Sequence, residues 1–164
     1  MNYIYLGKIV NTHGIKGEMR IISDFEYKNH VFKNNFNIYI GKEKNKEVIA
    51  TYRPHKNFDM VTLKGYNNIN EVLKYKGSMV FINRDELVLK ENEYLKTDLL
   101  NFDVVIDNNV IGTLVAFENH FKNIVMIIKN NEKSFLVPYH QQLIENIDFE
   151  NKQVIIKNIK GLVV

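Results

Sequence analysis

A β-hairpin is predicted near the start of the chain by the stretch Gly7-Lys8-Ile9-Val10-Asn11-Thr12-His13-Gly14-Ile15-Lys16-Gly17-Glu18-Met19-Arg20-Ile21. Residues 3–12 are apolar and β-branched in their middle, and Met19 and Ile21 alternate with polar residues, which is typical of strands with one buried face. Between the two strands, Gly14 and Gly17 permit the positive φ angles that a tight loop requires. The stretch therefore predicts strand, tight loop, strand.

The same period of two continues through the front half of the chain. Further strands are expected at residues 37–40, 47–52, 60–63 and 78–82, separated by turns at Gly41-Lys42, Arg53-Pro54 and Lys64-Gly65. One helix is expected at residues 69–75, with Asn68 or Asn70 as its cap and Gly77 just past its end. Six short strands at this spacing predict a small barrel rather than an open α/β sheet.

A second series of strands follows a polar stretch. Residues 84–96 carry four acids and lack extended alternation, so they predict a linker with at most a helical turn. Strands are then expected at 102–106, 110–117, 123–128, 134–137 and 153–159, with hairpin turns at 107–109 and 130–131, where Asn tolerates positive φ. Pro138 should end a strand, and residues 141–147 predict a short helix. The fold class is therefore mainly β, with domains at residues 1–84 and 98–164 and a linker at 85–97.

Composition excludes several classes of protein. With 45% hydrophobic and 12% aromatic residues the chain can build a core. It has no Cys, which excludes disulfide frameworks, thiolate metal sites and Cys nucleophiles. The five His lack the spacing of a helical metal site, so no metal is expected. No apolar run approaches the roughly 18–20 residues of a membrane span, and the N-terminus does not resemble a signal peptide.

Charge is divided unequally along the chain. Residues 1–90 hold 15 Lys and Arg against 9 Asp and Glu, whereas residues 91–164 hold 7 against 10. A basic front half attracts polyanions. The alternative is a chance asymmetry of solvated charges.

The glycine loop allows two interpretations. Backbone amides between Gly14 and Gly17, with Lys16 beside them, could bind an RNA phosphate. Alternatively, the loop is a plain barrel corner with His13 bonded to backbone. The spacing does not match a phosphate-binding P-loop. Several aromatic side chains could lie on the barrel rim and stack on bases, or could belong to the core: Tyr3, Tyr5, Phe25, Tyr27 and Phe58.

The order of the motifs resembles the RimM family. The resemblance begins with His13-Gly14-Ile15-Lys16-Gly17-Glu18 and continues with Ile69-Asn70-Glu71-Val72, Tyr75-Lys76-Gly77-Ser78 and Asn83-Arg84-Asp85-Glu86-Leu87. It then follows Asp98 to Val104, Val110-Ile111-Gly112-Thr113-Leu114, Phe135-Leu136-Val137-Pro138-Tyr139, Ile144 to Lys152 and Gly161-Leu162-Val163. The resemblance spans essentially the whole chain. It implies a six-stranded, translation-factor-like barrel followed by a PRC-barrel.

The resemblance also implies a function. A member of this family is a non-catalytic ribosome maturation factor without a cofactor, which binds the free small (30S) ribosomal subunit. Its expected partners are ribosomal protein nineteen of the head and the 16S rRNA of the head, whose processing and assembly it assists. We expect a monomer in the bacterial cytoplasm, although an organelle matrix also fits. The alternatives are a small flavin- or nucleotide-binding barrel enzyme and a generic RNA-binding protein.

Three groups of candidate residues follow. The candidates for RNA contact are Lys8, His13, Lys16 and Arg20. The candidates for ribosomal-protein contact are Tyr94, Leu95 and Lys96, where the family usually has two adjacent Tyr and this chain has Tyr94-Leu95. The residues expected at structural turns are Gly14, Gly17, Gly77, Gly112 and Pro138. A second departure from the family is Lys122-Asn123, in place of Asn-Asp, which is expected to alter a turn.

Overall fold

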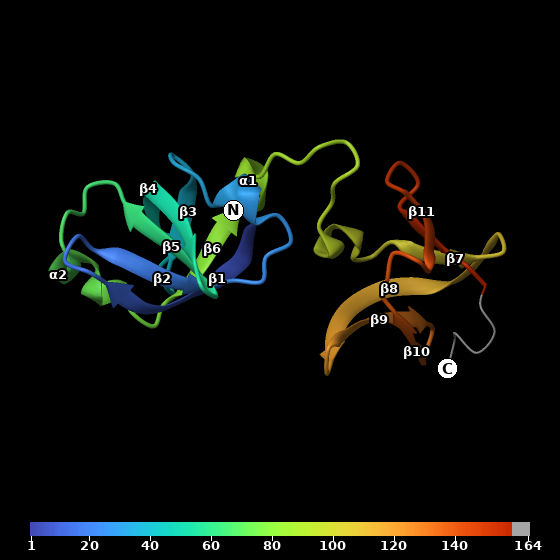
Figure 1. Cartoon of the computed structure of the whole chain (residues 1–164). Helices are drawn as coiled ribbons and strands as arrows, with labels where there is room; N and C mark the ends of the chain where they lie inside the picture. The colour runs from blue at the N-terminus through green and yellow to red at the C-terminus, as the bar shows by residue number, and fades with distance from the viewer. Residues whose placement is uncertain (159–164) are drawn as a thin grey trace. The chain divides into compact units, whose positions relative to one another are not determined.

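A computed structural model describes residues 1–158 of the protein and separates the chain into two units, Met1–Glu93 and the segment from Tyr94 onward (Figure 1). The first unit contains β1 (Tyr3–His13), β2 (Glu18–Ile22), α1 (Lys28–Val31), β3 (Asn37–Ile40), β4 (Asn45–His55), β5 (Phe58–Leu63), α2 (Ile69–Val72) and β6 (Met79–Asn83). Among residues 1–158, no helix is long and apolar enough to cross a bilayer.

The six strands of the first unit form the predicted closed barrel, in the order β1-β2-β5-β4-β3-β6. Alternate residues fill its interior, such as Met19 and Ile21 of β2 and Ile38 and Ile40 of β3, all fully buried. The predicted turn at Arg53-Pro54 is wrong. Both residues lie in β4, which continues to His55 and pairs with β5.

The predicted helix at residues 69–75 is confirmed as α2 followed by a 3₁₀ turn, Leu73–Tyr75. The side chain of Asn68 accepts a hydrogen bond from the backbone N–H of Glu71 at 3.3 Å, which is an N-cap. Gly77 follows with a φ of +84°. A helical turn, Arg84–Glu86, also forms after β6. Helix α1 was not predicted, because a single turn is too short to show a helical period.

The second unit is a six-stranded sheet with the order β10-β9-β8-β7-β12-β11. A 3₁₀ turn (Lys96–Leu99) precedes β7 (Asp103–Ile106), β8 (Asn109–His120), β9 (Asn123–Asn130), β10 (Lys133–Pro138), β11 (Ile144–Asp148) and β12 (Gln153–Ile156). Strands β7 to β10 follow one another as antiparallel neighbours, and β12 joins β7 in parallel. Residues 157 and 158 lie beyond β12, and residue 159 of the predicted last strand lies outside the described residues.

The helix predicted at residues 141–147 is wrong, because β11 occupies most of that segment. The β11–β12 pairing shifts register between Ile144 and Asn146, so Glu145 is an extra residue in the ladder. As a result Ile144 and Ile147 both pack against the core of the unit. The bulge allows two residues three apart in sequence to face the same side of a strand, and an apolar spacing of three is also typical of a helix.

Candidate binding surfaces

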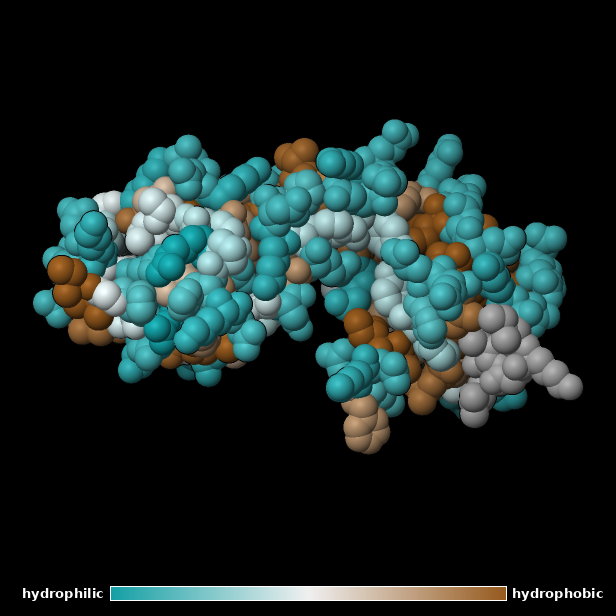
Figure 2. Space-filling model, viewed as in Figure 1, coloured by the Kyte–Doolittle hydropathy of each residue, from teal (hydrophilic) through white to brown (hydrophobic). Residues whose placement is uncertain are grey.

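The β1–β2 loop is fixed against α2. The carbonyl of Ile15 accepts a hydrogen bond from the N–H of Ile69 at 3.0 Å. Gly17, with φ +84°, lies so close to this segment that a Cβ atom would be 2.8 Å from the carbonyl oxygen of Asn68. Gly14 also has a positive φ, but open space surrounds it. The loop therefore presents Ile15 and Lys16 to solvent, and hydrophobic surface is visible beside α2 in Figure 2.

Two of the four RNA candidates, His13 and Arg20, are in contact. Arg20 Nη2 donates to His13 Nδ1 at 2.7 Å, and the guanidinium lies 5.4 Å from the centre of the Phe58 ring. His55 adds a second imidazole, with its ring centroid 6.3 Å from that of His13. The residues come from four strands, because β1, β2, β5 and β4 are neighbours in the barrel. We call this surface the arginine face.

Arg53 completes the arginine face. Its Nε and Nη2 atoms donate to both carboxylate oxygens of Glu18, at 2.8 and 2.7 Å. This bidentate bond is the main reason why the pKa of Glu18 lies below its usual value, although partial burial opposes the shift. The nearby imidazoles of His13 and His55 also lower the pKa of Glu18. Sequence reasoning missed Arg53 because Arg53-Pro54 looked like a turn.

Lys8 and Lys16 do not join the arginine face. Lys8 is exposed on β1 and pairs with Ile22 of β2 and Met79 of β6. It lies five residues from His13, roughly 16 Å along an extended strand. Lys16 is exposed at the tip of the β1–β2 loop. The predicted RNA candidates are thus spread over three places on one barrel.

The three candidates for ribosomal-protein contact differ in accessibility. Leu95 is only 2% exposed, so it packs inside the protein, and its side chain is not available for a partner. Tyr94 is half-buried against the core of the second unit, with its ring centroid 5.7 Å from that of Phe149. Lys96 begins the 3₁₀ turn. Of the three candidates, Tyr94 and Lys96 are therefore the ones that keep part of their surface exposed.

Two of the expected turn residues lie within strands. Gly112 is inside β8, where a Cβ atom would be 2.6 Å from the carbonyl oxygen of Lys129 on β9. It permits two strands to approach closely and does not form a turn. Pro138 is the last residue of β10, where a proline is expected to end the ladder.

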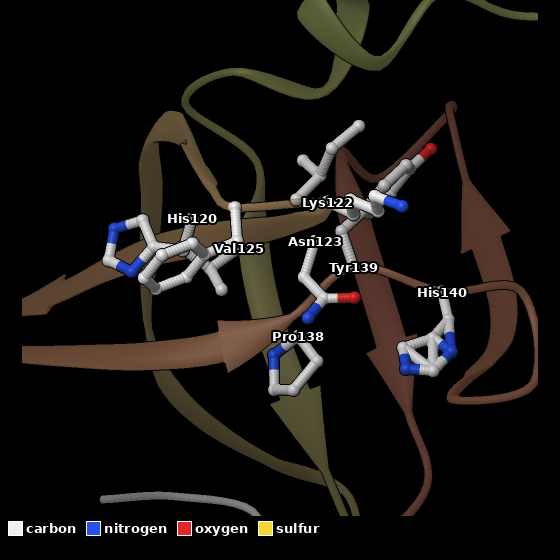
Figure 3. A pocket seen from close by; sticks show the side chains of 9 residues that line it. His120, Lys122, Asn123, Val125, Pro138, Tyr139 and His140 are labelled. Atoms are coloured by element: carbon white, nitrogen blue, oxygen red, sulfur yellow. The ribbon is translucent and has the colours of Figure 1, made fainter.

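The second unit also has a surface that the sequence did not predict. Phe121, at the β8–β9 turn, is fully exposed with a φ of +60°. Beside it lies a hollow of about 660 Å³ between the β8–β9 turn and the end of β10, with Lys122, Tyr139 and His140 in its lining (Figure 3). His120 Nε2 lies 2.8 Å from a carboxylate oxygen of Glu118. Bulky residues seldom adopt a positive φ, so this turn departs from ordinary hairpin chemistry.

Comparison with known proteins accounts for both units. The model of the RimM N-terminal domain matches residues 4–87, and the model of the RimM PRC barrel domain matches residues 96–162. The ribosome maturation factor RimM of an Exiguobacterium species is 36% identical over 99% of this chain and 98% of its own length. The protein of the same name from Bacillus thuringiensis is 36% identical over 96% of each chain. A solved RimM structure from Pseudomonas aeruginosa, named for 16S ribosomal RNA processing, aligns over 96% of this chain and 98% of its own with 20% identity and a TM-score of 0.43. The chain belongs to the RimM family.

Proposed function

We propose that this protein is a non-catalytic ribosome maturation factor that binds the free small ribosomal subunit in the bacterial cytoplasm. The observation that carries the proposal is the full-length similarity to proteins named ribosome maturation factor. In this role the chain would assist processing of 16S rRNA and assembly of the subunit head. Binding, not bond-making, would do the work, by shifting the head toward its mature conformation.

The first unit is the proposed RNA-facing part. This unit, Met1–Glu93, carries 15 Lys and Arg against 11 Asp and Glu, an excess of four cationic side chains. Lys8, Lys16 and the two arginines of the arginine face, Arg20 and Arg53, offer charged donors to phosphate, with His13 beside them. Because the interaction is largely electrostatic, affinity should fall steeply with added salt.

The second unit and the segment before it form the proposed protein-facing part. We propose that Tyr94 and Lys96 contact ribosomal protein nineteen of the small subunit. Tyr94 combines a ring packed on Phe149 with a polar hydroxyl, a combination common at protein interfaces. Because Leu95 is buried, the proposed contact does not include its side chain.

Co-sedimentation tests the proposed function. The protein should pellet with purified small subunits at low salt and should not pellet with large subunits. Absence from the small-subunit pellet would refute the proposal. Equal binding to unrelated RNAs would instead indicate a generic RNA-binding protein.

A pull-down with ribosomal protein nineteen tests the protein contact. Tyr94→Leu keeps apolar volume but removes the ring, so it should weaken capture, whereas Tyr94→Phe removes only the hydroxyl and separates the two contributions. Lys152→Ala, an exposed change elsewhere on the second unit, is the matched control. Unchanged capture by Tyr94→Leu and Lys96→Ala together would place the contact elsewhere.

A further inference from the structure

The outer surface of the first barrel carries an aromatic row that the proposed function does not use. Register places Tyr5 of β1 opposite Phe81 of β6, and Phe81 opposite Tyr39 of β3. Paired residues on neighbouring strands share a face of the sheet. The Tyr5 and Phe81 rings meet edge to face, with centroids 5.9 Å apart. Tyr39 lies at one end of this row, where it is buried and its hydroxyl bonds to Glu86, whereas Tyr5 at the other end remains 49% exposed.

A bulge brings a cation to the same face. The β1–β6 register shifts between Tyr5 and Gly7, so Tyr5 and Lys8 both point outward although they are three residues apart. Lys8 lies between Met79 of β6 and Ile22 of β2, two apolar side chains about half exposed. We call the surface of Tyr5, Lys8, Ile22, Met79 and Phe81 the stacking face.

The β3–β4 turn adds further positive charge at the edge of the stacking face. Lys44 Nζ lies 4.2 Å from the centre of the Phe81 ring and 5.7 Å from that of Tyr3. A hollow of about 340 Å³ is lined by Gly41, Lys42 and Lys44 of this turn, by Ser78, and by Met79 and Phe81 of β6. Glu43 is the acid of the turn. Lys8 and Lys44 therefore border a row made of the exposed Tyr5 ring and the partly buried Phe81 ring.

This combination matches one class of partner. The exposed Tyr5 ring, the partly buried Phe81 ring and the lysines beside them present flat apolar surface to bases and positive charge to phosphates. A protein partner would need acidic groups to meet Lys8, Lys42 and Lys44, whereas an RNA strand supplies a phosphate at every nucleotide. In a duplex the bases are already stacked, so only unpaired bases can lie on Tyr5 or Phe81.

We infer that the stacking face binds an unpaired RNA strand, with a base on Tyr5, a neighbouring base toward Phe81 and the hollow, and phosphates near Lys8 and Lys44. The inference rests on the proposed function, since it names the form of RNA that the first unit would recognise. It also gives the two faces of the barrel different roles. The stacking face would favour single-stranded over double-stranded RNA, and the arginine face would attract the phosphates of either form.

Fluorescence anisotropy with the full chain tests the inference. The probes are a labelled oligouridylate and an RNA hairpin of the same length. Wild type should bind the single strand more tightly. Tyr5→Val keeps a residue of high strand propensity but removes the ring, and it should weaken oligouridylate binding by about 5- to 150-fold, the effect of one stacked base. Tyr5→Phe keeps the ring and should bind as wild type.

Two further variants act as controls for this titration. Phe121→Asn removes the exposed ring of the second unit and should leave Kd for oligouridylate unchanged. Lys8→Gln should reduce the slope of log Kd against log salt by about 0.7, the value for one phosphate contact on a single strand. Equal affinity of wild type and Tyr5→Val, or equal binding of strand and hairpin, would overturn the inference.

Photo-crosslinking of wild type keeps the test independent of variant folding. Oligouridylate containing 4-thiouridine should crosslink to peptides with Tyr5, Met79 or Phe81, and crosslinks confined to other peptides would overturn the inference.

Co-sedimentation with small subunits distinguishes failure of this inference from failure of the proposed function. If wild type and Tyr5→Val pellet equally and bind the probe equally, the stacking face fails while the proposed function stands. If wild type binds the probe but never pellets with small subunits, the proposed function fails. If Tyr5→Val loses only subunit binding, the face contacts protein, which overturns the inference.

Discussion

Replacing Gly17 by Ala should destabilise the first unit far more than the same change at Gly14. Both glycines have positive φ, +84° at Gly17 and +71° at Gly14, so both substitutions place a Cβ in the left-handed region. The difference is space. At Gly17 the added carbon would lie 2.8 Å from the carbonyl oxygen of Asn68, whereas at Gly14 no atom lies within 4 Å.

The magnitudes follow from these two observations. A left-handed non-glycine residue costs about 1–2 kcal/mol, and the smaller entropy of the unfolded Ala chain returns about 0.4–1 kcal/mol. Gly14→Ala should therefore lose about 0–1.6 kcal/mol, the difference between these two effects. Gly17→Ala adds the overpacking of a backbone contact, about 1–3 kcal/mol, for a total of about 1–4.6 kcal/mol. In a unit of this size each kcal/mol lowers Tm by about 4–8 °C.

Thermal and denaturant unfolding of four variants separates the two causes. Asn tolerates positive φ, so Gly14→Asn should be nearly neutral while Gly17→Asn should still be destabilised by the contact with Asn68. Hydrogen exchange at the Ile69 amide gives a local readout, because that N–H donates to Ile15 across the loop. Equal losses at Gly14 and Gly17 would refute the close approach of the loop to α2.

Three further outcomes are expected. Burial, and to a lesser extent the hydrogen bond to Asp59, raises the pKa of Tyr52 to about 12. The first unit should therefore lose stability as pH rises from about 10, where an unfolded Tyr ionises, toward 12. Absorbance titration should show a lower Tyr52 pKa in Asp59→Asn. Leu95→Ala should cost about 2–5 kcal/mol in thermal unfolding, whereas Leu95→Met should cost less than about 1.5 kcal/mol and leave capture by ribosomal protein nineteen unchanged. Phe121→Asn should raise stability by up to about 1 kcal/mol, because Asn accepts the left-handed turn; a lower Tm would mean that the ring has contacts in solution.

The strands were predictable because a half-buried strand shows its period of two in the sequence. The alternation of Met19 and Ile21, for example, fixed both the existence and the inward face of β2. Prediction failed where the ladder is irregular. At β11 the extra residue Glu145 changes the apolar spacing from two to three, and an apolar spacing of three indicates a helix. Bulges depend on neighbouring strands, so a single segment does not reveal them.

The contacts at the candidate sites were also predictable only where they form within one hairpin. Contact between His13 and Arg20 follows from the β1–β2 hairpin, because Asn11 pairs with Arg20 and His13 with Glu18, which places their side chains on one face. Arg53 joins them only because β5 separates β2 from β4 in the barrel, and strand order is not a local property. The outward position of Tyr5 beside Lys8 likewise depends on a bulge against β6.

The front-half charge excess is unequally available to a phosphate on the two faces of the barrel. On the arginine face, Arg53 is engaged by Glu18 and Arg20 by His13, so an incoming phosphate must share or displace those partners. The Glu18–Arg53 pair is partly exposed, with half of the Arg53 side chain in solvent, and such pairs contribute only about 0–1 kcal/mol. On the stacking face, Lys8 has no ion-pair partner among residues 1–158, and its charge is available without rearrangement. A phosphate should therefore bind the stacking face without rearrangement of the protein. On the arginine face it should bind only when the Glu18–Arg53 pair opens. The contribution of the arginine face to RNA affinity should therefore depend more strongly on local geometry.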